Sequence, residues 1–273
     1  LGQLARRDAA VGARIAELLG DQDDEIVAQA SKLLGDVRHR ASADRLLPLL
    51  RHSAPRVRFF AAEALGRMAH RPAVTPLVEM LAANDDRDVY LRHAGSLALS
   101  RIGDAAALGP LSAHPSRGVR LAAVVALRRL KHANAALYLA DRDEQVVAEA
   151  ARAVNDDGGI ADGLPRLGAL LADARFGSEP LLRRAINANL RLGTPEAVAR
   201  LAAFAADTAR TAPLRVEAVS ALGVFLKPSN LDRVDGMYRG PSAPRAGAAG
   251  AARAAVARLI KTRPADQEMR VAL

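Results

Sequence analysis

Apolar residues recur along several stretches of this chain at the spacing i, i+3, i+4 and i+7, which is typical of amphipathic α-helices. The clearest cases are residues 42–51, 72–81, 161–173 and 194–207. The last stretch opens on Thr194-Pro195-Glu196, in which Thr can accept free amide N–H groups, Pro fits the first helical position, and Glu suits the positive end of the helix dipole. The pattern predicts an α-helix in each stretch.

A second pattern alternates with the first and recurs seven times. In most copies an aliphatic anchor residue follows an Asp, Pro or Glu, small residues come next, and Leu or Val stands eight positions after the anchor. The anchors are Ile26, Val57, Leu91, Val119, Val146, Leu182 and Leu214, which are 27–36 residues apart. This pattern predicts second helices near residues 24–36, 55–68, 89–102, 117–130, 144–155, 180–192 and 213–225.

Each repeat is therefore expected to be a hairpin of two antiparallel helices, and stacked hairpins share a core that one hairpin cannot form alone. The short period and the "VR..AA.AL" second helix resemble HEAT repeats, in particular the short type named after phycobilisome lyases. We expect an all-α fold: an α-solenoid of about seven HEAT-like hairpins over residues 1–240, forming a right-handed superhelix, with residues 241–273 as an Ala-rich capping helix or tail. Leu65, Leu99, Leu127 and Leu222 should then be buried between helices.

Composition supports this fold class and excludes several kinds of site. The 273 residues are half apolar but include only five Phe, three Tyr and no Trp, which favours helices over a β-sandwich or barrel. Cys is absent, so disulfides, thiol nucleophiles, thiolate metal sites and covalent haem attachment are excluded. No apolar run approaches the length of a membrane span. The start at Leu1, without a signal-peptide pattern, leads us to expect a chain that is either processed or, as we favour, cut out of a longer protein.

The positive charge is uneven. The net charge is +9, of which residues 158–273 carry +7, and 35 of the 39 basic residues are Arg. A basic concave surface could bind nucleic acid, as in HEAT-like DNA glycosylases, and we keep this as the alternative function. It is the weaker one, because acidic residues interleave with the Arg and the aromatic residues that stack on bases are few.

Arginines after the anchors suggest a structural ladder between repeats. These are Arg58, Arg92, Arg120, Arg183 and Arg215, and acidic residues such as Asp23, Asp88 and Asp143 stand before several anchors. We expect the acidic residues to cap the second helices and to face the Arg of a neighbouring repeat. His93 occupies a place where other repeats have Phe59-Phe60 or Leu121, so a helix-packed His is expected there. Arg92, His93, Arg120 and Arg183 are also our candidate binding residues, on the concave or inter-repeat surface.

Two Asn residues complete that candidate set. Asn187 and Asn189 replace the Ala-rich face of the sixth repeat, and polar residues inside a helix need hydrogen-bond partners. They either bond a neighbouring loop or line the concave surface. The same alternatives apply to NDDGGI (155–160), where Gly158-Gly159 first suggests a helix stop.

No catalytic or metal-binding pattern is present. The six His residues are not at metal-ligand spacing, no Ser stands in a nucleophile motif such as G-x-S-x-G, and the paired carboxylates fall in expected turns. A bilin-lyase activity would rest on the repeat type alone, and a fold does not carry a function. We therefore expect no enzyme activity, no cofactor and no metal.

Six strings between residues 56 and 239 extend the resemblance beyond generic HEAT repeats. They are RFFAAEALGRM, NDDRDVYLRHAGSLAL, RGVRLAAVVALRRL, VAEAARAVND, EPLLRRAINANLRLGTPEA and LDRVDGMYR. In this order they resemble the helical middle region of large secreted multidomain proteins of planctomycete- and verrucomicrobia-like bacteria. In that family a sugar-dehydrogenase-like propeller precedes the helical region and a c-type haem domain with a CxxCH motif follows it.

The resemblance implies a connecting or docking role between redox domains, in an extracytoplasmic location, with no chemistry in this region itself. After Gly240-Pro241 the chain departs from the family and continues into an Ala/Gly-rich stretch. The sequence thus predicts a non-catalytic protein-interaction or interdomain scaffold whose partners are proteins or neighbouring domains of the same chain.

Overall fold

A computed structural model of the chain describes residues 9–156, 160–262 and 267–272. Within these ranges all extended regular structure is helical, and one isolated β-bridge pairs Leu231 with Tyr238. The all-α prediction is confirmed. The chain divides into two compact units, residues 1–134 (unit 1) and 135–273 (unit 2), which are described separately. The predicted Gly158-Gly159 helix stop lies outside the described residues.

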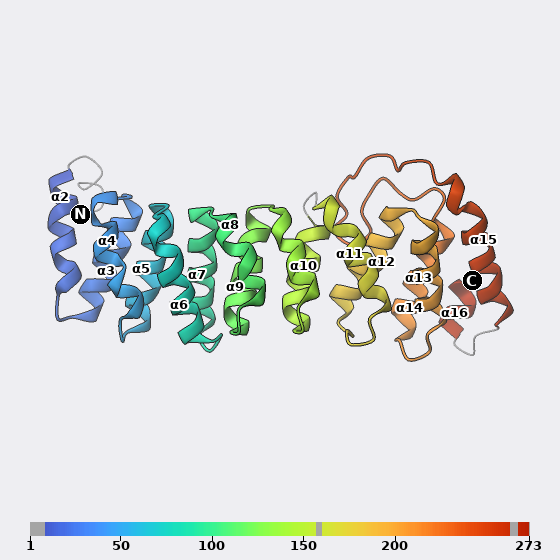
Figure 1. Cartoon of the computed structure of the whole chain (residues 1–273), viewed down its shortest axis with the longest axis horizontal. Coiled ribbons are helices and arrows are strands. Elements are labelled where there is room, and N and C mark those ends of the chain that lie inside the picture. Colours follow the sequence, from blue (N-terminus) through green and yellow to red (C-terminus); the bar gives the residue numbers. More distant parts are fainter. Residues whose placement is uncertain (1–8, 157–159, 263–266, 273) are drawn as a thin grey trace. The chain divides into compact units, whose positions relative to one another are not determined.

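In unit 1 the second helices of successive repeats pack on one another: α3 on α5, α5 on α7, and α7 on α9 (Figure 1). First helices lie between them in the sequence, and α6 contacts both α7 and α9. The α-helices of unit 1 are α2 (Ala9–Glu17), α3 (Asp24–Asp36), α4 (Ala43–Leu46), α5 (Pro55–Arg67), α6 (Val74–Asn84), α7 (Val89–Ile102), α8 (Ala105–Leu108) and α9 (Arg117–Arg129).

Unit 2 repeats this arrangement, with α12 packed against α10, α11, α13 and α14. Helix α15 packs on α13 and α14, and α16 packs on α14, so the segment 241–273 contains two helices in contact with the last hairpin. The α-helices of unit 2 are α10 (Glu144–Asn155), α11 (Leu164–Ala169), α12 (Glu179–Leu192), α13 (Pro195–Ala206), α14 (Ala212–Gly223), α15 (Ala246–Lys261) and α16 (Gln267–Ala272).

The second helices begin within one residue of their predicted starts, but several first helices are shorter than predicted. Residues 42–51 form α4 and a 3₁₀ turn that starts at Pro48, which cannot donate a helical hydrogen bond. Between α9 and α10 the first helix is replaced by 3₁₀ structure, since residues 130–143 leave little room for a helix and two turns. The 3₁₀ segments are η1 (Leu18–Gly20), η2 (Arg40–Ser42), η3 (Pro48–Arg51), η4 (Arg71–Ala73), η5 (Gly109–Ala113), η6 (Ala133–Ala140), η7 (Ala161–Gly163) and η8 (Leu170–Ala172).

The anchors form the core, with one exception. Val57, Val119 and the other anchors after the first are at most 4% exposed, and so are the four leucines predicted to be buried. Ile26, the first anchor, is 40% exposed and does not belong to the core. Val57 packs against Val27 and Ala28 of the preceding second helix, whereas among the described residues no earlier second helix lies against Ile26.

Two glycines set how closely the second helices of unit 1 approach. A Cβ on Gly35 would lie 2.7 Å from Cα of Ala64, and a Cβ on Gly66 would lie 2.6 Å from Cα of Ala98. Both distances are too short for any side chain. The stacking of α3 on α5 and of α5 on α7 therefore depends on these glycines. None of the described helices is long and apolar enough to span a membrane.

Candidate functional site

An aromatic groove lies in unit 1 where α5 and α7 begin. It has a volume of about 320 Å³. Its lining residues, which define the aromatic groove below, are Pro55, Arg56, Phe59, Phe60, Asp88, Tyr90 and Leu91. The Phe59 and Phe60 rings meet edge to face at 5.2 Å between centroids, and the Arg56 guanidinium lies 5.1 Å from the Phe60 centroid.

Helix capping places Tyr90 at the edge of this groove. The Asp88 carboxylate accepts hydrogen bonds from the backbone N–H groups of Tyr90 (2.8 Å) and Leu91 (3.3 Å) and so fixes the first turn of α7. The apolar anchor Leu91 is buried, while Tyr90 is 73% exposed. An aromatic ring so exposed beside an apolar groove is a feature of interaction surfaces.

A larger cavity of about 770 Å³ adjoins the aromatic groove and shares Pro55 and Asp88 with it. Arg58 and Arg87 line this basic cavity. Arg58 donates to the carbonyl oxygens of His52 and Ser53, and Arg87 donates to those of Ala83 and Asn84. Neither guanidinium forms an ion pair with a described residue, while the carboxylates of Asp88 and Glu79 line the same cavity, with Glu79 paired to Arg51.

Arg92 and His93, adjacent in α7, have different environments. Arg92 pairs with Asp86 of its own repeat, and Arg117 of the next repeat reaches the same carboxylate at 2.8 Å. His93 is exposed, so the expected helix-packed His is wrong. Its side chain points away from the packed face of α7, where Leu91, Ala94 and Gly95 lie.

The other two candidate arginines also differ from each other. Arg120 is only 5% exposed and donates to the carbonyl oxygens of His114 and Pro115 at 3.0 Å, within its own repeat. These two bonds satisfy free carbonyls at the end of the first helix and do not join one repeat to the next. Arg183 does bridge repeats, since it pairs with Glu179 at 2.8 Å and with Glu217 of the following repeat.

The inter-repeat ladder exists, but mostly at positions that sequence reasoning missed. Its ion pairs are Glu25–Arg56, Asp36–Arg67, Asp86–Arg117 and Asp156–Arg184. Burial raises the pKa of Asp36, but Lys32 and Arg67 outweigh burial, so its pKa lies below the ordinary value. An acidic residue followed by Arg at 28 or 31 positions, close to the repeat length, was the signal available in the sequence.

The expected caps are present. Asp23 accepts from the N–H of Glu25 at 2.8 Å, and Asp143 accepts from the N–H groups of Gln145 and Val146. Thr194 accepts from the N–H of Ala197 at the start of α13. The capping half of that prediction is confirmed, while the inter-repeat ion pairs of the ladder use other carboxylates.

Asn187 and Asn189 are buried in unit 2, at 2% and 0% exposure, and both side chains are hydrogen-bonded. The Asn187 Nδ2 donates to Oδ1 of Asn155 at 2.9 Å and to Oδ2 of Asp232 at 2.8 Å. The Asn189 Nδ2 donates to the carbonyl oxygens of Gly168 and Ala185 at 2.8 and 2.9 Å. Of the two alternatives, hydrogen bonding to neighbouring segments holds.

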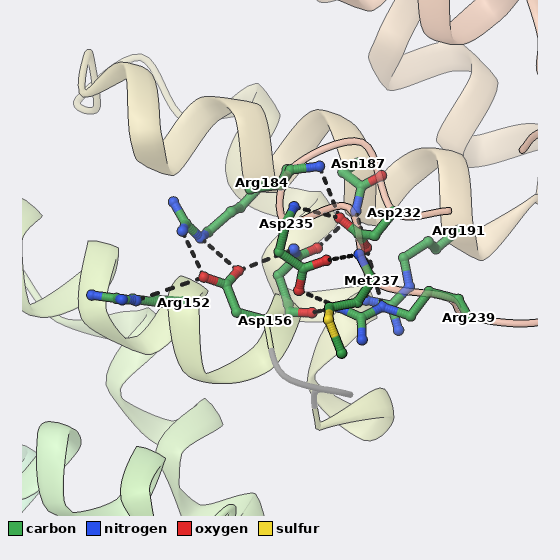
Figure 2. Close-up of polar contacts among 11 residues, drawn as sticks. Arg152, Asp156, Arg184, Asn187, Arg191, Asp232, Asp235, Met237 and Arg239 are labelled. Atoms are coloured by element: carbon green, nitrogen blue, oxygen red, sulfur yellow. Dashed lines mark hydrogen bonds and ion pairs between the residues drawn. The ribbon is translucent and has the colours of Figure 1, made fainter. Parts of the chain in front are cut away.

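Asp232 is the centre of a buried polar cluster (Figure 2). Its carboxylate accepts from the backbone N–H groups of Val234 and Asp235 and lies 3.3 Å from Nε of Arg239. Burial raises the pKa of Asp232, but these hydrogen bonds, that of Asn187 and the Arg239 charge outweigh it, so the pKa lies below the ordinary value. The cluster joins the segment 231–239 to α10 and α12.

Among the described residues no group of His, Asp and Glu is placed to hold a metal ion. The comparisons with known proteins concern the fold. Residues 12–100 match the family model for HEAT repeats. No curated protein matches the chain.

Many solved structures match the chain, and three of them serve as examples. An engineered protein has 16% identity and a TM-score of 0.45, over 94% of this chain and 75% of that one. The complex of CpcE and CpcF of phycocyanin lyase from Nostoc sp. PCC7120 has 19% identity and a TM-score of 0.41, over 91% and 94%. Human deoxyhypusine hydroxylase in complex with glycerol has 19% identity and a TM-score of 0.38, over 100% and 96%. At such TM-scores these likenesses carry no functional information.

The repeats themselves define the class of protein. The chain is an all-α, solenoid-type protein built from HEAT-like helical hairpins, and its residues 12–100 match the family model for HEAT repeats. Stacked repeats of this kind create extended surfaces that such proteins use for binding.

Proposed function

We propose that this chain is a protein-interaction scaffold and that the aromatic groove with the adjoining basic cavity is one of its binding surfaces. The observation that carries the proposal is Tyr90, which is 73% exposed beside the apolar wall of Phe59 and Phe60. Tyr is enriched at the energetic centres of protein interfaces because it buries a large area with little loss of side-chain freedom.

Charge decides the kind of partner. Arg58 and Arg87 line the neighbouring cavity and form no ion pair with a described residue, so an acidic group placed beside them and away from the Asp88 carboxylate gains attraction without breaking an ion pair. The occupant is a protein segment that places an apolar or aromatic side chain in the groove and acidic side chains beside these two arginines. The role is non-catalytic.

The finer proposal concerns where that segment comes from. The resemblance to the helical middle region of secreted redox proteins supports a segment from a neighbouring domain of the same, longer chain, in an extracytoplasmic protein. A photo-crosslinking residue at position 90 of that longer protein should then join the helical region to one of its own domains. If position 90 crosslinks only to other proteins, the groove is still a binding surface, but its occupant does not come from a neighbouring domain of the same chain.

The groove itself is tested with a random-peptide display library selected on the full chain. We expect enriched peptides to combine an aromatic or large aliphatic residue with Asp or Glu, and Tyr90→Ala to weaken their binding about tenfold or more. Arg87→Ala should weaken the acidic peptides and reduce the salt dependence of binding.

Arg45→Ala is the matched control for Arg87→Ala. Arg45 is an exposed residue of α4 in the same unit, away from both cavities, so its loss should leave peptide affinity unchanged. Equal binding by wild type and Tyr90→Ala, or no enrichment at all, would refute the groove as a binding surface.

A further inference from the structure

A separate cavity of about 340 Å³ lies within unit 2, between α12, the end of α14 and the segment 228–245. Leu190, Val224 and Leu231 give it an apolar wall. The hydroxyl-bearing residues Ser229 and Ser242 also line it. The remaining polar lining consists of four arginines, Arg191, Arg233, Arg239 and Arg245, together with Asn187 and the carboxylate-bearing Asp232.

The carboxylates near this arginine pocket are already occupied. Asp232 accepts from Asn187 and from two backbone N–H groups, and its side chain is fully buried. Arg239 forms ion pairs with Asp232, at 3.3 Å, and with Asp235. Only one of the four cations is therefore closely compensated.

The other three arginines are less closely compensated. Arg191 forms only a long ion pair with Asp232, at 3.9 Å, and Arg233 and Arg245 form no ion pair with any described residue. Arg233 donates to the hydroxyl of Ser220 at 3.0 Å, and Arg245 donates to the carbonyl of Phe225 at 2.8 Å. A hydroxyl or carbonyl satisfies a donor but leaves the charge in place.

Two of these charges are also shielded from water. Arg245 is 9% exposed and lies over the Phe225 ring, and the Arg191 side chain is 21% exposed. Burial lowers the pKa of both guanidinium groups. Arg245 has no ion pair among the described residues and Arg191 has only the long pair with Asp232, so an anion in the pocket would offset part of the free-energy cost of burying these charges.

Glu217 interacts electrostatically with Arg233, but its carboxylate is already paired with another arginine. Arg233 lowers the pKa of Glu217 through space, although burial outweighs this and leaves that pKa raised. The Glu217 carboxylate forms its ion pair with Arg183. It therefore does not neutralise the arginine pocket.

We propose that the arginine pocket binds a phosphate monoester, with the dianionic phosphate held by Arg191, Arg233 and Arg245 and an apolar or aromatic substituent against Leu190 and Val224. Guanidinium groups match phosphate oxygens bidentately, and charge-assisted hydrogen bonds are among the strongest in proteins. Three weakly compensated cations favour a dianion over a single carboxylate. This site lies in unit 2 and is independent of the aromatic groove proposed for unit 1.

The test is calorimetric titration of the full chain with phenyl phosphate at constant ionic strength. We expect saturable binding at one site, with Arg233→Ala and Arg191→Met each weakening it about tenfold or more. Arg233 is exposed, so its substitution leaves the packing of unit 2 intact even if Arg191→Met disturbs it. Arg253→Ala is the control, because Arg253 is an exposed arginine of α15 outside the pocket.

Two comparison ligands test whether the phosphate group and the apolar substituent each contribute to binding. Inorganic phosphate should compete with phenyl phosphate but bind more weakly, because it lacks the apolar substituent, and benzoate should bind more weakly still. Absence of saturable phenyl phosphate binding up to about 10 mM, equal affinity for benzoate, or an equal loss in Arg253→Ala would each overturn the proposal.

Discussion

At the scale of single residues, Asp232 shows how one carboxylate holds a loop onto two helices. Its carboxylate accepts hydrogen bonds from the backbone N–H groups of Val234 and Asp235 in its own turn, and from the side-chain amide of Asn187 in α12. Arg239 supplies the neutralising charge and also donates to the carbonyl of Asn155, the last residue of α10. A buried charge with this many donors is stabilising only while it is ionised.

Asp232→Asn should therefore destabilise the protein at neutral pH, by about 1.5–3 kcal/mol for the loss of charged hydrogen bonds. Because the folded pKa of Asp232 lies below the ordinary value of 3.8, its contribution is complete above that value and is lost as pH falls through the folded pKa. The two proteins should differ most near pH 7 and converge as the pH falls below 3.8 and through the folded pKa. Urea unfolding of both proteins across this pH range measures the loss of stability at neutral pH and its dependence on pH.

Asp162→Asn is the control for this pH profile. Asp162 is an exposed carboxylate of η7 in the same unit and outside the cluster. Its substitution should leave the acid side of the stability curve unchanged. A constant difference between wild type and Asp232→Asn at every pH would mean that the ionised form of Asp232 has no special role.

Local chemistry at single residues was predictable, and long-range partners were not. The sequence predicts that Asp88 caps a helix and that Asn187 needs a hydrogen-bond donor or acceptor nearby, because both requirements are set by the residue's own backbone position. It gives no sign that Asp232, 45 residues away, is that partner. Likewise, His93 occupies a repeat position that is apolar in other repeats, yet its side chain is exposed.

At the scale of elements, second helices were easier to predict than first helices. A second helix combines a cap or an N-terminal Pro with an apolar anchor and a Leu eight positions later, and all three signals agree. A first helix is predicted only by its apolar periodicity. Pro48 converts part of one first helix to 3₁₀ structure, and the short segment between α9 and α10 does the same to another.

The phase of α9 gives a direct test. Leu127 is 0% exposed, whereas Arg129 is an exposed residue two positions later on the same helix. Leu127→Ala should cost about 2–5 kcal/mol through the cavity it leaves, and Arg129→Ala should cost less than about 0.5 kcal/mol. Chemical denaturation compares them, and similar losses from both would contradict the assigned helix face.

At the scale of the whole molecule, each repeat of a HEAT-like array contacts mainly its neighbours, so stability is distributed locally along the chain. The close packing at two glycines of unit 1 illustrates this, since Gly35 faces Ala64 and Gly66 faces Ala98 in the next second helix. Sequence reasoning predicted the stacked hairpins but did not single out these glycines, because close approach depends on backbone geometry that a residue pattern does not contain.

Gly66→Ala should separate local from global stability. The added Cβ would lie 2.6 Å from Cα of Ala98, so α5 and α7 must move apart, and we expect faster hydrogen exchange in both helices. The helices of unit 2 should keep their protection, because neither Gly66 nor Ala98 belongs to that unit.

Gly20→Ala is the matched substitution in unit 1, since a Cβ at Gly20 meets no atom within 4 Å and should leave exchange unchanged throughout. Mass spectrometry of exchanged peptides from α5, α7, α13 and α14 distinguishes the alternatives. Loss of protection in all four helices at once would mean that the chain unfolds as one cooperative body. The nearest-neighbour description of its stability would then be wrong, even though every repeat is built as described.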